Sequence, residues 1–429
     1  MDPVQQEKMQ TSPSSGLHYG WIIFIVGFLV EGGALGLARF GYSMILPGML
    51  ADPHLHLSPA QTGLIASANM IGYTISALVA GFLASRYGPK VIIIIGLVWV
   101  ALTMAATGLA TGASTVALAR FLTGLGSAAA HISGMGLLVA WFSTRRRGMA
   151  TGFFVGGTGL GLFLNGWTVP LINGIYLDVG WRYNWYLLGL IAAAVAILAA
   201  VLLRNSPAEK NLLPIGEVPG AQTPAKPANG GKQKSESVSI GNIIKIKGVP
   251  MLTIMYFCFG FSYIIVSTYM VTFLVQEAHC SQALAGHIWS IVGLISIISG
   301  LIWGMISDRF GRRNILATVF LLQAVCYLLL QARFTDGFLL WLAPMMFGLV
   351  AWSIPGMVAA TCGDISDPKR APAVLGFATF IYSIGQVLGP TTAGYIKAAT
   401  GSFGWAFLLA AGLAVLGAIF ASRIMMPRN

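Results

Sequence analysis

Charged residues are scarce in this chain. Of its 429 residues only 9% are Asp, Glu, Lys or Arg, whereas 56% are apolar. So few charged groups cannot cover the surface of a water-soluble protein of this length. The composition therefore predicts a membrane protein.

Acidic residues are especially few, with 13 Asp and Glu against 25 Lys and Arg. The net charge of +12 does not indicate nucleic-acid binding, because no loop carries a basic face with interleaved aromatic residues. Twenty of the 25 basic residues fall in the tails and in alternate loops between apolar runs; the other five are Arg39, Arg120, Arg182, Arg333 and Lys397. Because Lys and Arg favour cytoplasmic loops, we expect both termini in the cytoplasm.

Motifs for metals, disulfides, export and catalysis are also missing. The four cysteines show no paired spacing, which argues against a zinc site or a disulfide framework. The first seventeen residues lack the pattern of a removable signal peptide. The glycine-rich run from Gly152 to Gly161 follows no strand and precedes no Lys, so it is no phosphate loop. We expect neither an enzyme nor a cofactor, since no nucleophile, base and metal set is assembled.

Long apolar runs, in contrast, are abundant. A helix needs about 20 residues to cross a bilayer, and the alternating pattern of a membrane barrel is absent. We predict an all-α polytopic membrane protein with twelve transmembrane helices, near residues 19–49, 58–84, 91–110, 115–142, 149–176, 183–203, 250–276, 283–306, 314–332, 337–361, 371–397 and 403–425.

The sequence repeats after about half its length. Gly304–Arg313 reads Gly-Met-Ile-Ser-Asp-Arg-Phe-Gly-Arg-Arg, and a weaker copy, Gly81–Lys90, lies 223 residues earlier, with Ser85 in place of the Asp. Trp181 and Trp405 repeat with a similar offset. We therefore predict two homologous six-helix halves. The expected organisation is a tail (1–18), a first bundle (19–205), a flexible linker rich in Pro, Gly, Lys and Ser (206–244), and a second bundle with a short tail (245–429).

These features resemble the major facilitator superfamily of secondary transporters over nearly the whole chain, with Gly304–Arg313 as the most specific motif. Within it, Gly36–Pro47 resembles a bacterial YbfB/YjiJ-like branch, and His18-Tyr19-Gly20-Trp21 is similar to the opening of oxalate/formate and monocarboxylate porters. The resemblance implies the major facilitator fold, a bacterial inner membrane, a chain that works as a monomer, and alternating access of two bundles to a small-molecule site at the midplane.

Four ionisable residues fall inside the expected spans: Glu31, Arg39, Arg120 and His131. Such groups cost at least about 2.5 kcal/mol at mid-bilayer and normally face a wet cavity. Arg39 offers a guanidinium fork to an anion, and helical spacing places Tyr42 beside it. Arg120 is as well suited to bracing helices as to touching substrate.

Glu31 and His131 are predicted to lie at similar depth, just cytoplasmic of the midplane. Gly32 and Gly33 leave space beside the Glu31 carboxyl, an arrangement suited to a proton carrier, whereas His131 could instead hydrogen-bond a backbone carbonyl. The equivalent positions in the second half carry no charge, since Arg120 maps near Pro344. We infer that the first half binds the charged groups and that the second half determines the shape of the site.

Further candidates are uncharged or lie in loops. Those for substrate contact, each of which could instead serve packing, are Asn69, Asn165, Tyr256, Tyr263, Trp352 and Gln386. The repeated loops are candidates for gating, because Asp308 can pair with the positive N-terminus of helix 11, as the family resemblance implies, or can simply mark topology. The gating set is Gly81, Arg86, Gly88, Gly304, Asp308, Arg309, Gly311, Arg312 and Arg313.

The sequence therefore favours a secondary transporter that moves a small organic anion, a carboxylate, by proton-coupled alternating access. In the alternative, the chain exports neutral or amphipathic metabolites or drugs, and Arg39 is structural. Substrate, protons and the lipid bilayer are the expected partners. Import or export, the coupling ion and the stoichiometry stay open.

Overall fold

The computed structural model describes residues 17–143, 145–217, 243–331, 337–367 and 370–426. These residues form helices, and their only strand-like feature is the single bridge between Phe142 and Ile215. The first half contains α2 (Gly20–Glu31), a π-helical turn (Gly32–Leu37), α3 (Gly41–Ala51), α4 (Pro59–Tyr87), α5 (Pro89–Leu109), α6 (Ala113–Trp141), α7 (Arg147–Tyr176) and α8 (Gly180–Leu202). The second contains α10 (Val249–Gln276), α11 (Gln282–Phe310), α12 (Arg312–Gln331), α13 (Phe338–Val350), α14 (Ile354–Ile365), α15 (Ala371–Thr400) and α16 (Gly404–Ser422).

Within these described ranges, eleven helical stretches are long and apolar enough to cross a membrane. One of them, Arg147–Leu202, holds both α7 and α8, which a short 3-10 turn, Leu177–Val179, separates. The twelve expected spans are therefore present, and the prediction of an all-α, twelve-helix architecture is confirmed.

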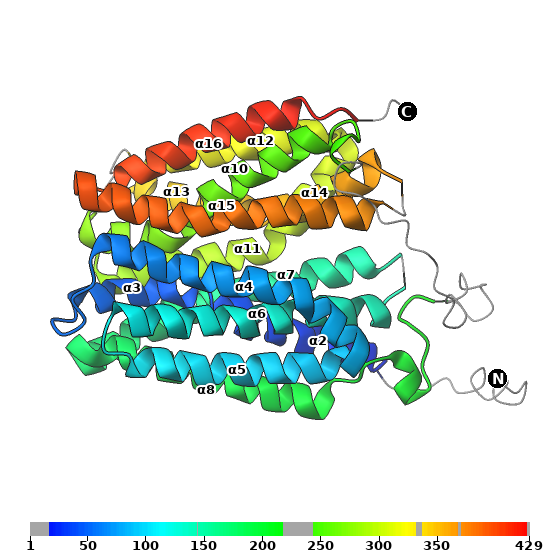
Figure 1. Cartoon of the computed structure of the whole chain (residues 1–429), viewed down its shortest axis with the longest axis horizontal. Helices are drawn as coiled ribbons and strands as arrows, with labels where there is room; N and C mark the ends of the chain where they lie inside the picture. Colours follow the sequence, from blue (N-terminus) through cyan, green and yellow to red (C-terminus); the bar gives the residue numbers. More distant parts are fainter. Residues whose placement is uncertain (1–16, 144, 218–242, 332–336, 368–369, 427–429) are drawn as a thin grey trace, which may run out of the picture.

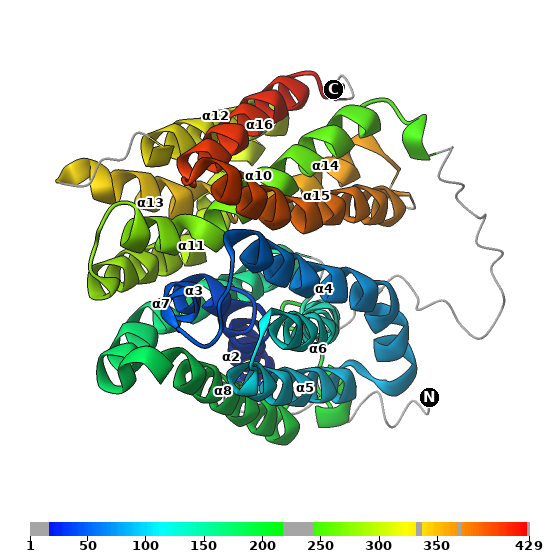
Figure 2. The same cartoon turned by 60° about the vertical axis from the view of Figure 1, so that its left-hand side comes forward.

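Helices α2 to α8 form one bundle, here the N bundle, and α10 to α16 form the other, the C bundle (Figures 1 and 2). We call the end of the molecule at which α2 begins and α16 ends the terminal end, and the opposite end the far end. The middle of the expected linker, residues 218–242, lies outside the described residues. The linker's first part returns to the N bundle, where the Ser143 N–H donates to the Ile215 carbonyl at 3.1 Å.

The two bundles touch at the far end and at mid-depth. There Ser67 of α4 donates to the Val387 carbonyl of α15 at 2.5 Å, and Ser290 of α11 donates to the Phe163 carbonyl of α7 at 3.0 Å. Glycines allow the close approach: a Cβ on Gly159 would lie 2.4 Å from the Gly293 carbonyl oxygen. The hydrogen bonds that join Thr62 to Tyr269, Ser67 to Val387 and Ser290 to Phe163 across the bundles all lie in the half of the spans nearer the far end. The structure is thus closed at the far end.

One carboxylate stabilises the far end of each bundle. Asp52, after α3, accepts a hydrogen bond from the Trp181 indole at 2.7 Å, and Glu277, after α10, accepts one from Lys397 at 2.7 Å and one from the Phe403 N–H at 2.7 Å. Burial raises the pKa of each carboxyl, but these donors outweigh burial and hold both pKa values below the usual range. Both groups therefore remain ionised at neutral pH and stabilise the helix ends they join.

The repeated loops turn at glycine. Gly88 and Gly311 have φ angles of 88° and 89°, which other residues rarely adopt. Each glycine separates two spans by one residue, so α4 with α5, and α11 with α12, form tight helical hairpins at the terminal end.

Candidate functional site

The first span is broken at mid-depth. Its helix α2 ends at Glu31, the π-helical turn follows, and residues 38–40 form a turn before α3 begins. Gly36 permits the break because it packs directly on α7, where its Cβ would lie 2.7 Å from the Gly161 Cα. Interrupted spans and π-helical turns commonly mark ligand sites in membrane transporters.

Two side chains bind the carbonyl groups that the break exposes. Asn165 of α7 donates to the Gly36 carbonyl at 2.9 Å, and Arg120 of α6 donates to the carbonyls of Ala38 at 2.5 Å and Arg39 at 3.3 Å. Buried carbonyls within a membrane need such partners. Arg120 is only 1% exposed. The structure therefore places Arg120 as a brace of the broken span, which fixes the backbone of Arg39.

Arg39 has a different environment. Its Nε donates to the Met70 sulfur at 3.1 Å, Nη2 also contacts that sulfur, and the guanidinium lies over the Tyr73 ring at 4.9 Å. Arg39 is buried, with only 7% of its surface exposed. Among the described residues no carboxylate lies within ion-pairing distance of its guanidinium. A thioether is a weak acceptor, and a guanidinium has five N–H donors. Arg39 is thus a buried cation with unused capacity for an anion.

Glu31 and His131 form a hydrogen-bonded pair. The Glu31 Oε2 lies 2.8 Å from His131 Nδ1, and the Thr158 hydroxyl donates to Oε1 at 3.1 Å. The Glu31 side chain is fully buried, whereas that of His131 is 16% exposed. The imidazole is therefore the more exposed member of the pair, and the carboxylate is enclosed.

Tyr73 of α4 lies between Arg39 and this pair. The centroid of its ring lies 4.9 Å from the Arg39 Cζ and 6.2 Å from the centroid of the His131 ring. The side chain is half-buried at the middle of α4. The cation and the Glu31–His131 pair therefore belong to one continuous site rather than two separate ones.

The C bundle contributes a polar cluster at the same depth. Gln386 of α15 donates to the hydroxyls of Tyr263 at 2.6 Å and Tyr382 at 2.8 Å, and these hydroxyls lie 3.2 Å apart. Tyr256 stacks on Tyr382 with ring centroids 4.3 Å apart and an interplanar angle of 12°. The second half thus supplies neutral hydrogen-bonding groups and a stack of aromatic rings.

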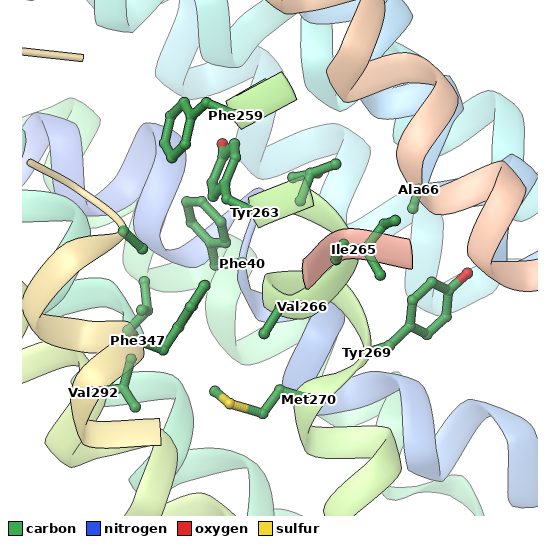
Figure 3. Packing of buried hydrophobic residues seen from close by; sticks show 14 of the residues in the cluster. Phe40, Ala66, Phe259, Tyr263, Ile265, Val266, Tyr269, Met270, Val292 and Phe347 are labelled. Carbon is green, nitrogen blue, oxygen red and sulfur yellow. The ribbon is translucent and has the colours of Figure 1, made fainter. Parts of the chain in front are cut away.

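The N and C parts of the site face each other. Phe40, next to Arg39, packs edge-on against Trp352, which lies in the turn between α13 and α14, with ring centroids 5.7 Å apart. Figure 3 shows Phe40 in the same apolar cluster as Tyr263 and Phe347. Both bundles therefore place a break beside the site, in α2–α3 and in α13–α14.

Four of the expected substrate contacts point elsewhere: Arg120 and Asn165 bind the broken span, as described above, and Tyr42 and Asn69 bind other backbone carbonyls. Tyr42 donates to the Thr62 carbonyl at 2.9 Å and does not share the surroundings of Arg39, because the turn at residues 38–40 interrupts helical spacing. Asn69 donates to the Arg120 carbonyl at 2.9 Å and joins α4 to α6. Arg39, Tyr256, Tyr263 and Gln386 lie at or beside the site.

The expected gating residues lie at the terminal end. Asp308 has a largely exposed side chain (64%) and pairs with Arg312 at 2.9 Å, while Arg312 also contacts Asp364 at the end of α14. Arg86 and Arg309 lie over the rings of their neighbours Tyr87 and Phe310. The Asp308 carboxylate pairs with Arg312 at the start of α12, and among the described residues of α15, which begin at Ala371, it has no hydrogen-bond or ion-pair partner.

Four residues that surround the expected ones are not predicted by the sequence: Met70, Tyr73, Thr158 and Tyr382. Tyrosine and threonine are common in apolar spans, and nothing local distinguishes these positions. The break itself had a signal, because three glycines, Gly32, Gly33 and Gly36, occur within five residues at the middle of the first span.

Comparison with known proteins places this geometry in context. The family model described as "Uncharacterised MFS-type transporter YbfB" matches residues 32–422. The hexuronate transporter of Bacillus subtilis is 26% identical over 94% of this chain and 94% of its own, and the gallate transporter of Pseudomonas putida is 27% identical over 75% of this chain and 73% of its own. A bacterial homologue of the lysosomal transporter Spinster, crystallised inward-facing and occupied, superposes with a TM-score of 0.75 at 14% identity, covering 96% of this chain and 98% of its own.

Proposed function

The chain belongs to the family of MFS-type transporters represented by YbfB, and from this premise we propose that it carries a small carboxylate anion across the membrane together with a proton. It is a multi-pass secondary transporter and not an enzyme. The finer proposal concerns what the transporter carries and how the transport is driven.

One observation carries the proposal: Arg39 is a buried cation at mid-depth without a carboxylate partner among the described residues. Burying an unpaired charge is costly, and a bound anion would supply the missing partner of the Arg39 guanidinium. Its planar fork matches the two oxygens of a carboxylate. The relatives named for hexuronate and gallate carry anions of this kind.

The proton site is the Glu31–His131 pair. When the pair is deprotonated, its negative charge offsets the field of Arg39; when it takes up a proton, the site becomes more positive and binds an anion more tightly. Linkage makes the effect reciprocal, so a bound anion strengthens proton binding. Proton and anion would then move together as the bundles rock about the site.

The proposal is tested by binding and uptake measured on the purified protein in liposomes. A panel of glucuronate, gallate, 4-hydroxybenzoate and benzoate covers sugar acids and aromatic acids. At least one member should bind, and a proton gradient should drive its accumulation. If none binds while neutral amphipathic compounds are carried, the alternative of a neutral-substrate exporter replaces this proposal.

We also propose a bacterial inner membrane with both termini and residues 206–244 in the cytoplasm. A cysteine introduced at Gly230, which lies outside the described residues, should resist impermeant thiol reagents in intact cells, whereas one at His54 at the far end should react. The native cysteines Cys258, Cys280, Cys326 and Cys362 are all buried and give little background. The reverse labelling pattern would overturn this orientation.

Asp308 is proposed to stabilise the state that is closed at the terminal end. Because its carboxylate is exposed here, its contact with α15 would form only when the terminal end closes, and Asp308→Asn should shift the population toward the present state. Transport turnover should fall several-fold while anion affinity changes less than about twofold. Asp178→Asn, an exposed position at the far end, is the control. Normal turnover of Asp308→Asn at normal expression would limit this residue to marking topology.

A further inference from the structure

The cluster of Gln386, Tyr263 and Tyr382 contains one more donor than it uses. The Gln386 amide has two N–H groups, and both are donated, one to each tyrosine oxygen. A third hydrogen bond joins the two hydroxyls, with Tyr382 as donor. Two hydroxyls bring two protons, and only one of them is used by this bond.

The unused proton belongs to Tyr263. Its oxygen accepts two hydrogen bonds, from Gln386 and from Tyr382, and its own O–H has no acceptor among the residues that the structure describes. Tyr263 is only 4% exposed. A buried donor without an acceptor is unfavourable, so an oxygen atom of a ligand, or a water that precedes it, is expected beside this hydroxyl.

This donor lies across the site from Arg39. Phe40, the neighbour of Arg39, belongs to the same buried cluster as Tyr263 (Figure 3) and packs on Trp352 of the C bundle, with ring centroids 5.7 Å apart. Tyr263 and Gln386 lie at the middle of α10 and α15, as Tyr73 does in α4. A ligand whose carboxylate is held by Arg39 therefore extends toward Tyr263.

Aromatic rings surround this hydroxyl. Phe259 stacks on Tyr263 at 4.6 Å between centroids, and Tyr256, Phe259 and Tyr382 stack on one another with interplanar angles of 1–13°. The stack gives the C-bundle side of the site an apolar lining. The site thus combines an anion anchor, an apolar face and a single hydroxyl donor.

We infer that Tyr263 donates a hydrogen bond to an oxygen on the end of the substrate remote from the carboxylate, so that the transporter selects hydroxylated carboxylates over their unsubstituted analogues. This inference rests on the proposed anion site. In this scheme Arg39 of the N bundle recognises the charge of the substrate, and Tyr263 of the C bundle recognises its hydroxyl group.

The test compares matched ligands on purified protein. Dissociation constants are measured for 4-hydroxybenzoate against benzoate, and for 4-hydroxycyclohexanecarboxylate against cyclohexanecarboxylate, with wild type, Tyr263→Phe and Tyr382→Phe. Wild type should prefer the hydroxylated member of at least one pair by about three- to tenfold. Tyr263→Phe keeps the aromatic stack, so it should bring this ratio to about one through weaker binding of the hydroxylated acid alone.

Two further variants serve as controls. Tyr382→Phe should keep the preference of wild type for the hydroxylated acid. Tyr395→Phe removes the hydroxyl of an exposed tyrosine on α15 and controls for loss of a hydroxyl.

The outcomes separate the two proposals. If wild type binds none of these acids and none of the earlier panel, the anion site itself is wrong. If acids bind but wild type shows no preference, or if Tyr263→Phe leaves the preference intact, the anion site stands and the role of Tyr263 is wrong. Loss of preference only in Tyr382→Phe would move the donor to that residue and overturn the assignment.

Discussion

Glu31→Gln should abolish proton-driven accumulation of the carried anion and leave anion exchange intact. For one proton per monovalent anion, a gradient of one pH unit should allow wild type about tenfold accumulation. Glutamine keeps the hydrogen-bonding shape beside His131 and Thr158 but cannot release a proton. The variant would therefore be held in the anion-accepting charge state and would only equilibrate substrate across the membrane.

The measurement is uptake of labelled anion into liposomes, with and without a pH gradient, followed by counterflow against unlabelled anion. Glu209→Gln, an exposed glutamate near the terminal end, is the matched control and should accumulate like wild type. Full gradient-driven accumulation by Glu31→Gln would show that the proton travels by another route.

Replacing Arg39 should weaken anion binding more than any other single change in the site. Loss of a buried, charge-assisted partner typically costs about 2–5 kcal/mol, so Arg39→Ala should weaken binding by at least about 30-fold. Arg39→Lys keeps the charge but loses the fork, and a loss of about tenfold is expected. Isothermal titration with the best-bound panel anion measures both.

Thermal unfolding distinguishes the two buried arginines. Arg39 has no oxygen partner among the described residues, so Arg39→Ala should leave the unfolding temperature unchanged or raise it. Arg120→Ala leaves the buried carbonyls of Ala38 and Arg39 without their hydrogen-bond donor and should therefore clearly lower the unfolding temperature. Unchanged anion affinity in Arg39→Ala would remove the cation from the site and favour a neutral-substrate exporter.

The fold could be predicted from the sequence because its signals are global. Twelve apolar runs, segregated basic loops and the repeated Gly304–Arg313 motif each depend on composition over many residues, and the bilayer permits few alternatives for such a chain. The turns at Gly88 and Gly311 followed from the same repeat. A prediction from these features does not depend on the correct interpretation of any single residue.

The site could be predicted only in part. Glu31, Arg39 and His131 attract attention because charge is rare inside spans, and the structure brings Glu31 and His131 within 2.8 Å. The surroundings of Arg39 could not be derived, because the break after Glu31 changes which side chains share a face. Tyr73 and Tyr382 gain their positions from packing between helices far apart in sequence, which local patterns do not encode.

The central claim, that anion and proton bind together at one site, is tested most directly by the protons taken up when an anion binds. Purified protein in weakly buffered solution is mixed with the tightest-binding panel anion, and the pH change is followed at a series of starting pH values from about 5 to 8, the range in which an unperturbed imidazole changes charge. Wild type should take up protons, approaching one per anion bound at some pH in that range, and Glu31→Gln should bind the anion without this uptake. Anion binding by wild type with no proton uptake anywhere in that range would contradict the account.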